Sequence, residues 1–311
     1  MKKLYIALLF LLYALGVKSQ QDPQYTQYMY NMSIINPAYT TNETGMINFG
    51  TLYRSQWQNA EGAPETLTFF AHAPLSNKVE TGISLISDNI GDGVLKENNV
   101  YVDFAYILKL NADSNLSLGL KGGITNFETN FSGFRLPEFQ DDEAFNENLN
   151  SIFPNVGVGA FYTRPNFYAG VSAPNLLTST HLDNQDGINR IGSEEIHLFF
   201  TSGYIYELNP NLKIKPSIMT KMVAGSPISL DTSLNVLFNN RFEGGLSYRL
   251  EDAVSAMFNI SVVPAIRIGY AYDYTLSNLG SFNAGSHEIF ALFDLDLLGL
   301  KKGYDKSPRF Y

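Results

Sequence analysis

The chain has 311 residues, of which 45% are hydrophobic, 14% aromatic and only 16% charged, a composition that predicts an ordered, strand-rich protein and excludes disorder for most of its length. Its formal net charge of −9 leaves no basic surface for a phosphate backbone, so nucleic acid is excluded as an expected partner. The absence of cysteine excludes disulfides, thiolate metal sites and cysteine nucleophiles.

Residues 1–19 are predicted to be a secretion signal that is removed before Gln20. Lys2 and Lys3 precede an apolar run from Leu4 to Val17, which is shorter than the roughly 20 residues that span a bilayer as a helix. The alternative interpretation is an N-terminal membrane anchor.

Beyond this signal every apolar run is interrupted too early for a transmembrane helix, and the pattern that remains has a period of two. In 265–275, for example, Ile268 and Tyr270 share one face, while Arg267 and Asp273 share the other. Fourteen strands are predicted in this way, at 45–53, 66–76, 79–88, 97–110, 116–127, 154–163, 166–173, 194–207, 211–222, 229–238, 241–250, 253–262, 265–275 and 286–297.

The connections between these strands alternate in length along the chain. Those after odd-numbered strands are mostly long, at 54–65, 89–96, 128–153, 174–193, 223–228, 251–252 and 276–285, while those after even-numbered strands are all short, at 77–78, 111–115, 164–165, 208–210, 239–240 and 263–264. This alternation is typical of an outer-membrane barrel. The alternative fold, a secreted β-sandwich, does not require long and short loops to alternate. We therefore predict an all-β fold, a single transmembrane antiparallel β-barrel of about 14 strands over 45–297, with short periplasmic turns and long extracellular loops.

Three segments stand apart from the barrel wall. Residues 20–44, rich in Tyr, Gln and Asn, are expected to form a plug in the lumen or an arm in the periplasm. The acidic connection 128–153 is expected to be a solvated outward face, with a contact to a cation or to cargo as the alternative. Residues 298–311 are expected to form a basic periplasmic tail.

Charged residues on the inward face of the predicted strands fit either pore selectivity or pairing inside a closed barrel. They are Asp103, Lys121, Arg267, Asp273, Glu288 and Asp294. No catalytic constellation is found, because the four histidines, His72, His181, His197 and His287, lack the spacing of a metal pair or of a triad. We therefore predict no enzymatic activity, no metal site and no cofactor; an outer-membrane lipase or protease would require a histidine-based site.

Several sequence blocks, in order along nearly the whole chain, resemble the PorP/SprF family of type IX secretion and gliding-motility outer-membrane proteins. The blocks are Gln21-Asp22-Pro23-Gln24-Tyr25-Thr26-Gln27-Tyr28-Met29-Tyr30-Asn31, Asn36-Pro37-Ala38-Tyr39, Arg54-Ser55-Gln56-Trp57, Gly62-Ala63-Pro64-Glu65-Thr66, Pro154-Asn155-Val156-Gly157-Val158-Gly159, Tyr168-Ala169-Gly170-Val171-Ser172-Ala173-Pro174, Gly269-Tyr270-Ala271-Tyr272-Asp273-Tyr274, Ser286-His287-Glu288-Ile289 and Ser307-Pro308-Arg309.

The resemblance implies an outer-membrane barrel of a Bacteroidetes-type Gram-negative bacterium that assists type IX export. It implies attachment of a large surface adhesin through the adhesin's C-terminal sorting domain, with secretion components and the lipid bilayer as the other partners. A general secretion role and a cargo-specific anchor both stay open at this point, and a passive or substrate-specific pore is the alternative function.

The resemblance also suggests site residues. The candidates for partner binding are Trp57, Gly62, Ala63, Pro64, Asp141, Asp142, Glu143 and Arg309. The N-terminal family motif comprises Gln24, Tyr25, Gln27, Tyr28, Asn36 and Pro37. The alternative for Arg54, Trp57, Tyr25 and Pro37 is a structural role, in which they fix the barrel rim and seat the N-terminal plug.

Overall fold

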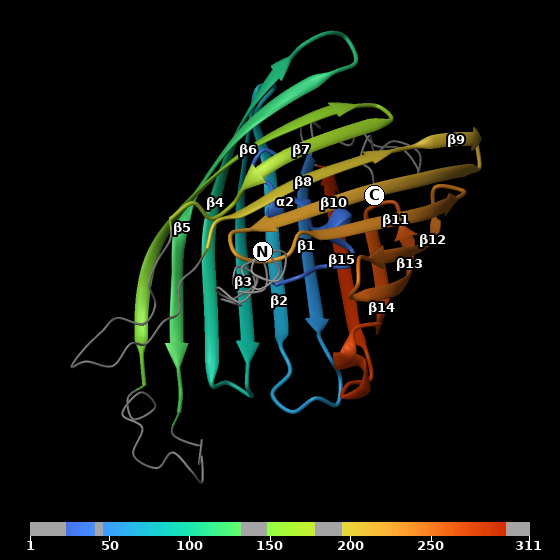
Figure 1. Ribbon diagram of the computed structural model, residues 1–311. Coiled ribbons are helices and arrows are strands. Elements are labelled where there is room, and N and C mark those ends of the chain that lie inside the picture. The colour runs from blue at the N-terminus through green and yellow to red at the C-terminus, as the bar shows by residue number, and fades with distance from the viewer. Residues whose placement is uncertain (1–22, 41–45, 132–147, 178–194, 297–311) are drawn as a thin grey trace, which may run out of the picture.

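The computed structural model describes residues 23–40, 46–131, 148–177 and 195–296. Most of them belong to one antiparallel sheet (Figure 1). The elements are η1 (Tyr28–Tyr30), α2 (Met32–Ile35), β1 (Met46–Ser55), β2 (Glu65–Ser76), β3 (Val79–Ile90), β4 (Leu95–Lys109), β5 (Asn115–Thr129), β6 (Asn150–Arg164), β7 (Phe167–Ala173), β8 (His197–Tyr204), β9 (Tyr206–Asn209), β10 (Leu212–Val223), β11 (Ser229–Phe238), β12 (Phe242–Arg249), β13 (Ala253–Val263), β14 (Ile266–Thr275), η3 (Asn278–Ser281) and β15 (Ser286–Asp296).

The sheet closes on itself, because the first strand pairs with the last. Met46 of β1 lies opposite Asp296 of β15, and Arg54 lies opposite Glu288. β8 and β9 follow one another along the same side of β10, so they count as one strand of the wall. Within the described residues the wall is therefore a closed, antiparallel, 14-stranded barrel, which confirms the predicted fold class.

The predicted continuous strand 194–207 is interrupted at Ile205. β7 begins at Phe167, which lies opposite Tyr204, so among the described residues β9 has only β10 as a partner. The Ile205 amide instead donates to the Asn166 carbonyl of the neighbouring turn, at 2.8 Å. The break thus lies where the wall loses one neighbouring strand.

Strands β3 to β6 are longer than the sequence predicts. β5 runs to Thr129 and β6 begins at Asn150, so Glu128 belongs to a strand and not to the predicted loop 128–153. Here both faces of the sheet carry polar side chains, which pair across strands: Ser87 Oγ donates to Asn98 Oδ1 at 2.8 Å. The apolar alternation used to locate strands is missing there, although the backbone pairing continues.

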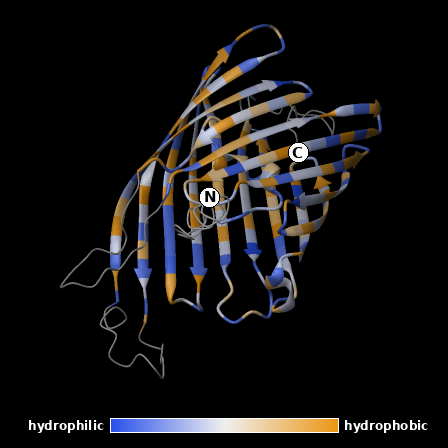
Figure 2. Cartoon of the chain, viewed as in Figure 1, coloured by the Kyte–Doolittle hydropathy of each residue, from blue (hydrophilic) through white to orange (hydrophobic). Residues whose placement is uncertain are grey.

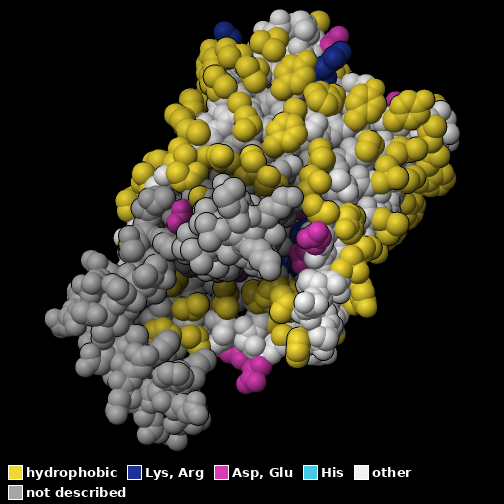
Figure 3. Space-filling view, in the orientation of Figure 1, with side chains coloured by type: hydrophobic (Ala, Val, Ile, Leu, Met, Phe, Trp, Pro, Cys, Tyr) yellow, Lys and Arg dark blue, Asp and Glu magenta, His cyan; other side chains and the backbone are white. Residues whose placement is uncertain are grey.

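The two faces of the wall have opposite character. Val102 and Leu120 face outward with 54% and 60% of their surface exposed, whereas Asp103 faces inward with 2% exposed. Figure 2 shows this alternation along the strands, and Figure 3 shows the apolar exterior that results. An apolar outside around a polar inside inverts the pattern of a water-soluble protein and matches a barrel that faces lipid. Within the described residues, no helix is long and apolar enough to cross a membrane.

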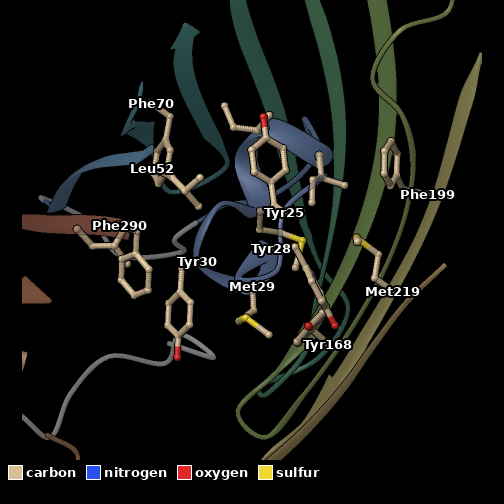
Figure 4. Packing of buried hydrophobic residues seen from close by; sticks show 14 of the residues in the cluster. Tyr25, Tyr28, Met29, Tyr30, Leu52, Phe70, Tyr168, Phe199, Met219 and Phe290 are labelled. Carbon is tan, nitrogen blue, oxygen red and sulfur yellow. The ribbon is translucent and has the colours of Figure 1, made fainter. Parts of the chain in front are cut away.

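Residues 23–40, which we call the plug, lie inside the barrel (Figures 1 and 4). Their two helical pieces, η1 and α2, have three and four residues, too short to be stable alone. Nearly every plug side chain is buried, including Tyr28, Tyr30 and Asn36. The plug therefore takes its conformation from contacts with the wall.

Candidate functional site: a plugged lumen below an open vestibule

The start of the plug is held by a buried group of charges on β1, β14 and β15. The Arg54 guanidinium lies 2.8 Å from Asp273 and 3.2 Å from Glu288. Glu288 accepts hydrogen bonds from the backbone amides of Thr26 and Gln27, at 2.9 and 2.7 Å. The Thr26 hydroxyl donates to Asp273 at 2.6 Å. One arginine thus neutralises two carboxylates. The oxygens of these carboxylates also accept hydrogen bonds from the plug and hold it in place.

A second polar group holds Tyr30 on the side of the barrel formed by β10, β12 and β13. The Tyr30 hydroxyl donates to Glu243 at 2.5 Å and accepts from the Asn259 amide at 2.8 Å. Lys215 pairs with the same Glu243 at 2.9 Å. The Tyr30 ring stacks on Phe290, with centroids 4.5 Å apart, as the close view in Figure 4 shows. The wall therefore provides hydrogen-bond partners for the Tyr30 hydroxyl and an aromatic packing partner for its ring.

The helical turn α2 is held from the opposite side by polar side chains of the wall. Lys121, which lies 3.7 Å from Asp103, donates to the Ile34 carbonyl at 3.1 Å. The Ser172 hydroxyl donates to the Ile35 carbonyl at 2.8 Å. These bonds satisfy carbonyls at the end of a helix that is too short to pair them internally.

The last part of the plug packs against glycines of the wall. The Asn36 side-chain amide donates to the carbonyls of Ala160 and Val171, on β6 and β7, at 3.2 and 3.3 Å. A methyl group on Gly159 would lie 2.1 Å from Asn36 Oδ1, so only glycine leaves room for this contact. The plug thus touches β1, β5, β6, β7, β10, β12, β13, β14 and β15, and it contacts the wall on several sides of the lumen.

On the side of the plug that faces the long connections, the barrel opens into a cavity of about 610 Å³, which we call the vestibule. Apolar side chains such as Trp57, Ile228 and Leu279 line it together with charged ones such as Asp88 and Arg249. A narrower pocket of about 50 Å³ continues below it, between the plug and the wall. The two share the residues Pro23, Gln24, Lys221, Ser229 and Arg249. The floor of the vestibule is therefore the start of the plug.

The loops around the vestibule are joined by backbone hydrogen bonds. The Gly91 amide donates to the Gly62 carbonyl at 2.9 Å, and the Gln58 amide donates to the Gly285 carbonyl at 2.7 Å. Trp57 and Gly62 have positive φ angles of 48° and 69°. The Trp57 amide donates to the Ser286 hydroxyl at 3.1 Å. Loops 56–64, 91–94 and 276–285 thus form one connected rim.

The predicted partner-binding residues divide into two groups. Trp57 and Pro64 line the vestibule, while Gly62 and Ala63 shape the turn between them. Asp141, Asp142, Glu143 and Arg309 lie outside the described residues. All residues of the predicted N-terminal motif lie in the plug: Gln24 reaches the vestibule, and the other five are Tyr25, Gln27, Tyr28, Asn36 and Pro37.

The charged residues predicted to face the lumen all do so. Asp103, Lys121, Asp273 and Glu288 are buried in the contacts described above. Arg267 lies 3.6 Å from Glu243, and Asp294 accepts a hydrogen bond from Asn48. They make internal contacts within the plugged barrel.

Among the described residues, the predicted set of lumen-facing charges lacks seven further buried charges, Arg54, Glu80, Lys215, Lys221, Asp231, Glu243 and Arg249. Two of them pair with each other, since Arg249 Nε donates to Asp231 at 2.8 Å. The signal that could have found them is the same period-two alternation, which places Lys215, Asp231 and Glu243 on the inward faces of their strands.

The histidines are dispersed over the barrel. His72 points into the lumen, 3.8 Å from Glu80, while His287 points outward and is hydrogen-bonded to the Tyr270 hydroxyl. His181 lies outside the described residues. No group of His, Asp and Glu side chains in the described part of the chain could hold a metal ion.

Several solved outer-membrane barrels are similar to this chain in fold. Omp33 of Acinetobacter baumannii is 10% identical, with a TM-score of 0.48, and the match covers 82% of this chain and 100% of Omp33. A FadL homologue of Pseudomonas aeruginosa is 11% identical, with a TM-score of 0.48, over 89% of this chain and 95% of the homologue. The toluene transporter TbuX of Ralstonia pickettii is 10% identical, with a TM-score of 0.45, over 85% of this chain and 93% of TbuX.

None of the curated protein sequences matches this chain. The family model of the type IX secretion system membrane protein PorP/SprF matches residues 17–293, which is most of the chain and confirms the resemblance seen in the sequence blocks. The chain therefore belongs to the PorP/SprF family of type IX secretion system membrane proteins and is an outer-membrane β-barrel of a Gram-negative bacterium.

Proposed function

We propose that the protein is a non-enzymatic partner of type IX secretion that retains an exported, adhesin-type cargo at the cell surface. In this proposal the vestibule and its rim receive the C-terminal sorting domain of the cargo. The observation that carries the proposal is the combination of a filled lumen with an open mouth. A lumen held shut by buried ion pairs on several sides is unsuited to passing a polypeptide, whereas a shaped cavity at the outer end is suited to binding one.

The connected rim supports this role. Loops 56–64, 91–94 and 276–285 hold one another through backbone hydrogen bonds, so a partner that docks on them does not have to order them. The lining mixes aromatic and aliphatic side chains with charged ones, which is the composition of a protein-binding pocket and not of a uniform ion path.

The acidic residues Asp141, Asp142 and Glu143 are proposed as further cargo contacts from the same end of the barrel. The tail, 298–311 with Arg309, is proposed to meet periplasmic components of the secretion system. Deletion of residues 301–311 should then leave a folded, heat-modifiable barrel but abolish display of cargo. Normal display after this deletion would refute the role of the tail.

The direct test is purification of the tagged protein from its native outer membrane, followed by mass spectrometry of what co-purifies. We expect recovery of a large surface protein, represented by its C-terminal fragment. Ile228→Glu places a charge among the apolar lining of the vestibule and should lower this recovery at least tenfold. Leu110→Glu is the matched control, because Leu110 is similarly exposed, 55% against 60%, but lies at the short-turn end.

Two outcomes would contradict the proposal. Recovery of periplasmic components alone would favour a general role in secretion over a cargo anchor. Equal loss of cargo in the Ile228→Glu and Leu110→Glu variants would show that the vestibule is not the docking site.

The alternative function is a passive or substrate-specific pore. Planar-bilayer recording of the purified protein separates the two, because a barrel whose lumen is filled by residues 23–40 should be nearly silent. Steady conductance of the wild-type protein would favour the pore function over the cargo-anchor function.

A further inference from the structure

The exposed charges of the described residues are distributed unequally between the two ends of the barrel. Within the described part of the chain, the long-loop end has four exposed acidic side chains, Glu61, Glu65, Asp92 and Glu251, and one exposed basic side chain, Lys96. At the short-turn end the balance is reversed. The exposed basic side chains there are Lys78, Lys109 and Arg164, with Lys213, Arg241 and Arg267 half-exposed, against the exposed acidic Asp113 and Glu207 and the half-exposed Asp294 and Asp296.

These basic residues follow the circumference of the barrel. Lys78 lies in the turn between β2 and β3, Lys109 ends β4, Arg164 ends β6, and Arg241 lies in the turn between β11 and β12. Lys213 is the second residue of β10, next to the turn between β9 and β10, and lies opposite Glu207. Five of the six short turns between the described strands therefore have one of these five basic residues in the turn or beside it. In Figure 3, dark blue side chains stand out at the upper edge, above the apolar wall.

Two of these positions, Lys109 and Arg241, adjoin exposed apolar side chains. Leu108 and Leu110 flank Lys109, and both are exposed. The Arg241 guanidinium lies 5.4 Å from the ring centroid of Phe242, which is itself exposed, and its Nε donates to the Ser261 carbonyl. Basic side chains at the border of an apolar belt are placed where phospholipid phosphates lie.

We propose that this short-turn rim, defined by Lys78, Lys109, Arg164 and Arg241, binds the headgroups of anionic phospholipids in the inner leaflet. Short turns of outer-membrane barrels face the periplasm, so the rim lies at the level of that leaflet. A lipid leaflet fits better than a protein partner, because the basic residues are spread around the wall and Lys109 and Arg241 are next to exposed apolar side chains. A single docked protein would favour a patch on one side.

Native mass spectrometry of the full-length protein, released from mixed micelles of dioleoylphosphatidylglycerol and dioleoylphosphatidylcholine, tests the proposal. We expect the wild-type protein to retain phosphatidylglycerol in preference to phosphatidylcholine. A basic side chain near an anionic surface contributes about fivefold to binding. Arg164→Gln should therefore lower the preference severalfold, and the combined variant Lys78→Gln, Lys109→Gln, Arg164→Gln, Arg241→Gln should abolish it.

Lys96→Gln is the matched control, because it removes one exposed positive charge from the opposite end. It should leave the preference unchanged. The basic residues of the tail are present in every variant, so they cancel in the comparison. If the combined variant does not fold, the pair Arg164→Gln and Lys96→Gln still decides the outcome.

Three results would overturn the proposal. The first is equal retention of both lipids by the wild-type protein, which would leave the rim free for a protein partner. The second is a preference that survives in the combined variant. The third is an equal loss of preference in the Lys96→Gln and Arg164→Gln variants.

Discussion

Gly119 of the barrel wall lies so close to Ala38 of the plug that a methyl group built on Gly119 would come within 2.2 Å of the Ala38 backbone nitrogen. The obstacle is backbone on both sides, so neither partner can yield by rotating a side chain. Gly119→Ala should therefore lower the free energy of unfolding by about 1–3 kcal/mol, or displace the plug. Guanidinium unfolding and planar-bilayer conductance measure the two effects.

Gly122 of the same strand provides the control for this substitution. A methyl group there meets nothing within 4 Å. Gly122→Ala should leave conductance unchanged and alter stability by less than about 1 kcal/mol. Wild-type behaviour of both variants would show that the wall does not hold the plug at Gly119.

Replacing Arg54 by Met tests the buried charges at the start of the plug. The change leaves Asp273 and Glu288 buried without their cation, which typically costs about 3–5 kcal/mol. We expect a lower temperature for the heat-modifiable transition on gel electrophoresis. Lys96→Met, at an exposed position, should shift this temperature very little, and an unchanged transition for Arg54→Met would show that the ion pairs do not stabilise the barrel.

We expect the Tyr30 hydroxyl to contribute more to the free energy of unfolding than an exposed tyrosine hydroxyl does. Tyr30→Phe leaves Glu243 and Asn259 without this partner inside the barrel and should cost about 1–3 kcal/mol. Tyr53→Phe removes an exposed hydrogen bond to Glu65 and should cost less than about 0.5 kcal/mol. Equal unfolding midpoints in guanidinium for the two variants would contradict this ranking.

Gly62 combines a φ angle of 69° with a close neighbour, because a methyl group on it would lie 3.0 Å from the Gly91 Cα atom. Gly62→Ala should therefore separate loops 56–64 and 91–94 and reduce the recovery of cargo with the purified barrel. Gly244→Ala has a normal φ and a nearest contact of 3.9 Å, so it should retain cargo. Full recovery of cargo by the Gly62→Ala protein would argue against a preformed rim.

The sequence was sufficient to predict the wall because each strand repeats the same two-sided pattern. Alternation places Asp103 inside and Val102 outside without reference to any other strand. Where the pattern stops, the prediction fails: the polar ends of β3 to β6 are held by cross-strand pairs such as Ser87 with Asn98, which local hydrophobicity does not reveal.

The contacts of the plug could not be predicted in the same way. Alternation assigns a side chain to a face but gives no partner for it. The pairing of Arg54 with Glu288 depends on which residues of the first and last strands lie opposite one another. Tyr30 reaches Glu243 only because the plug has a particular height in the lumen, and nothing local in 23–40 sets that height. The tight fit at Gly119 depends on the same placement.

The position of Arg54 also bears on how the closed barrel is held together. Arg54 and Glu288 belong to the first and last strands, whose pairing closes the cylinder, and the same Glu288 binds the amides of Thr26 and Gln27. Without the plug the ion pairs of the wall would remain, but Glu288 would lose the amide donors of Thr26 and Gln27. The same carboxylate therefore contacts both the seam of the cylinder and the start of the plug, so the stability of the closed seam and that of the plug are coupled through Glu288.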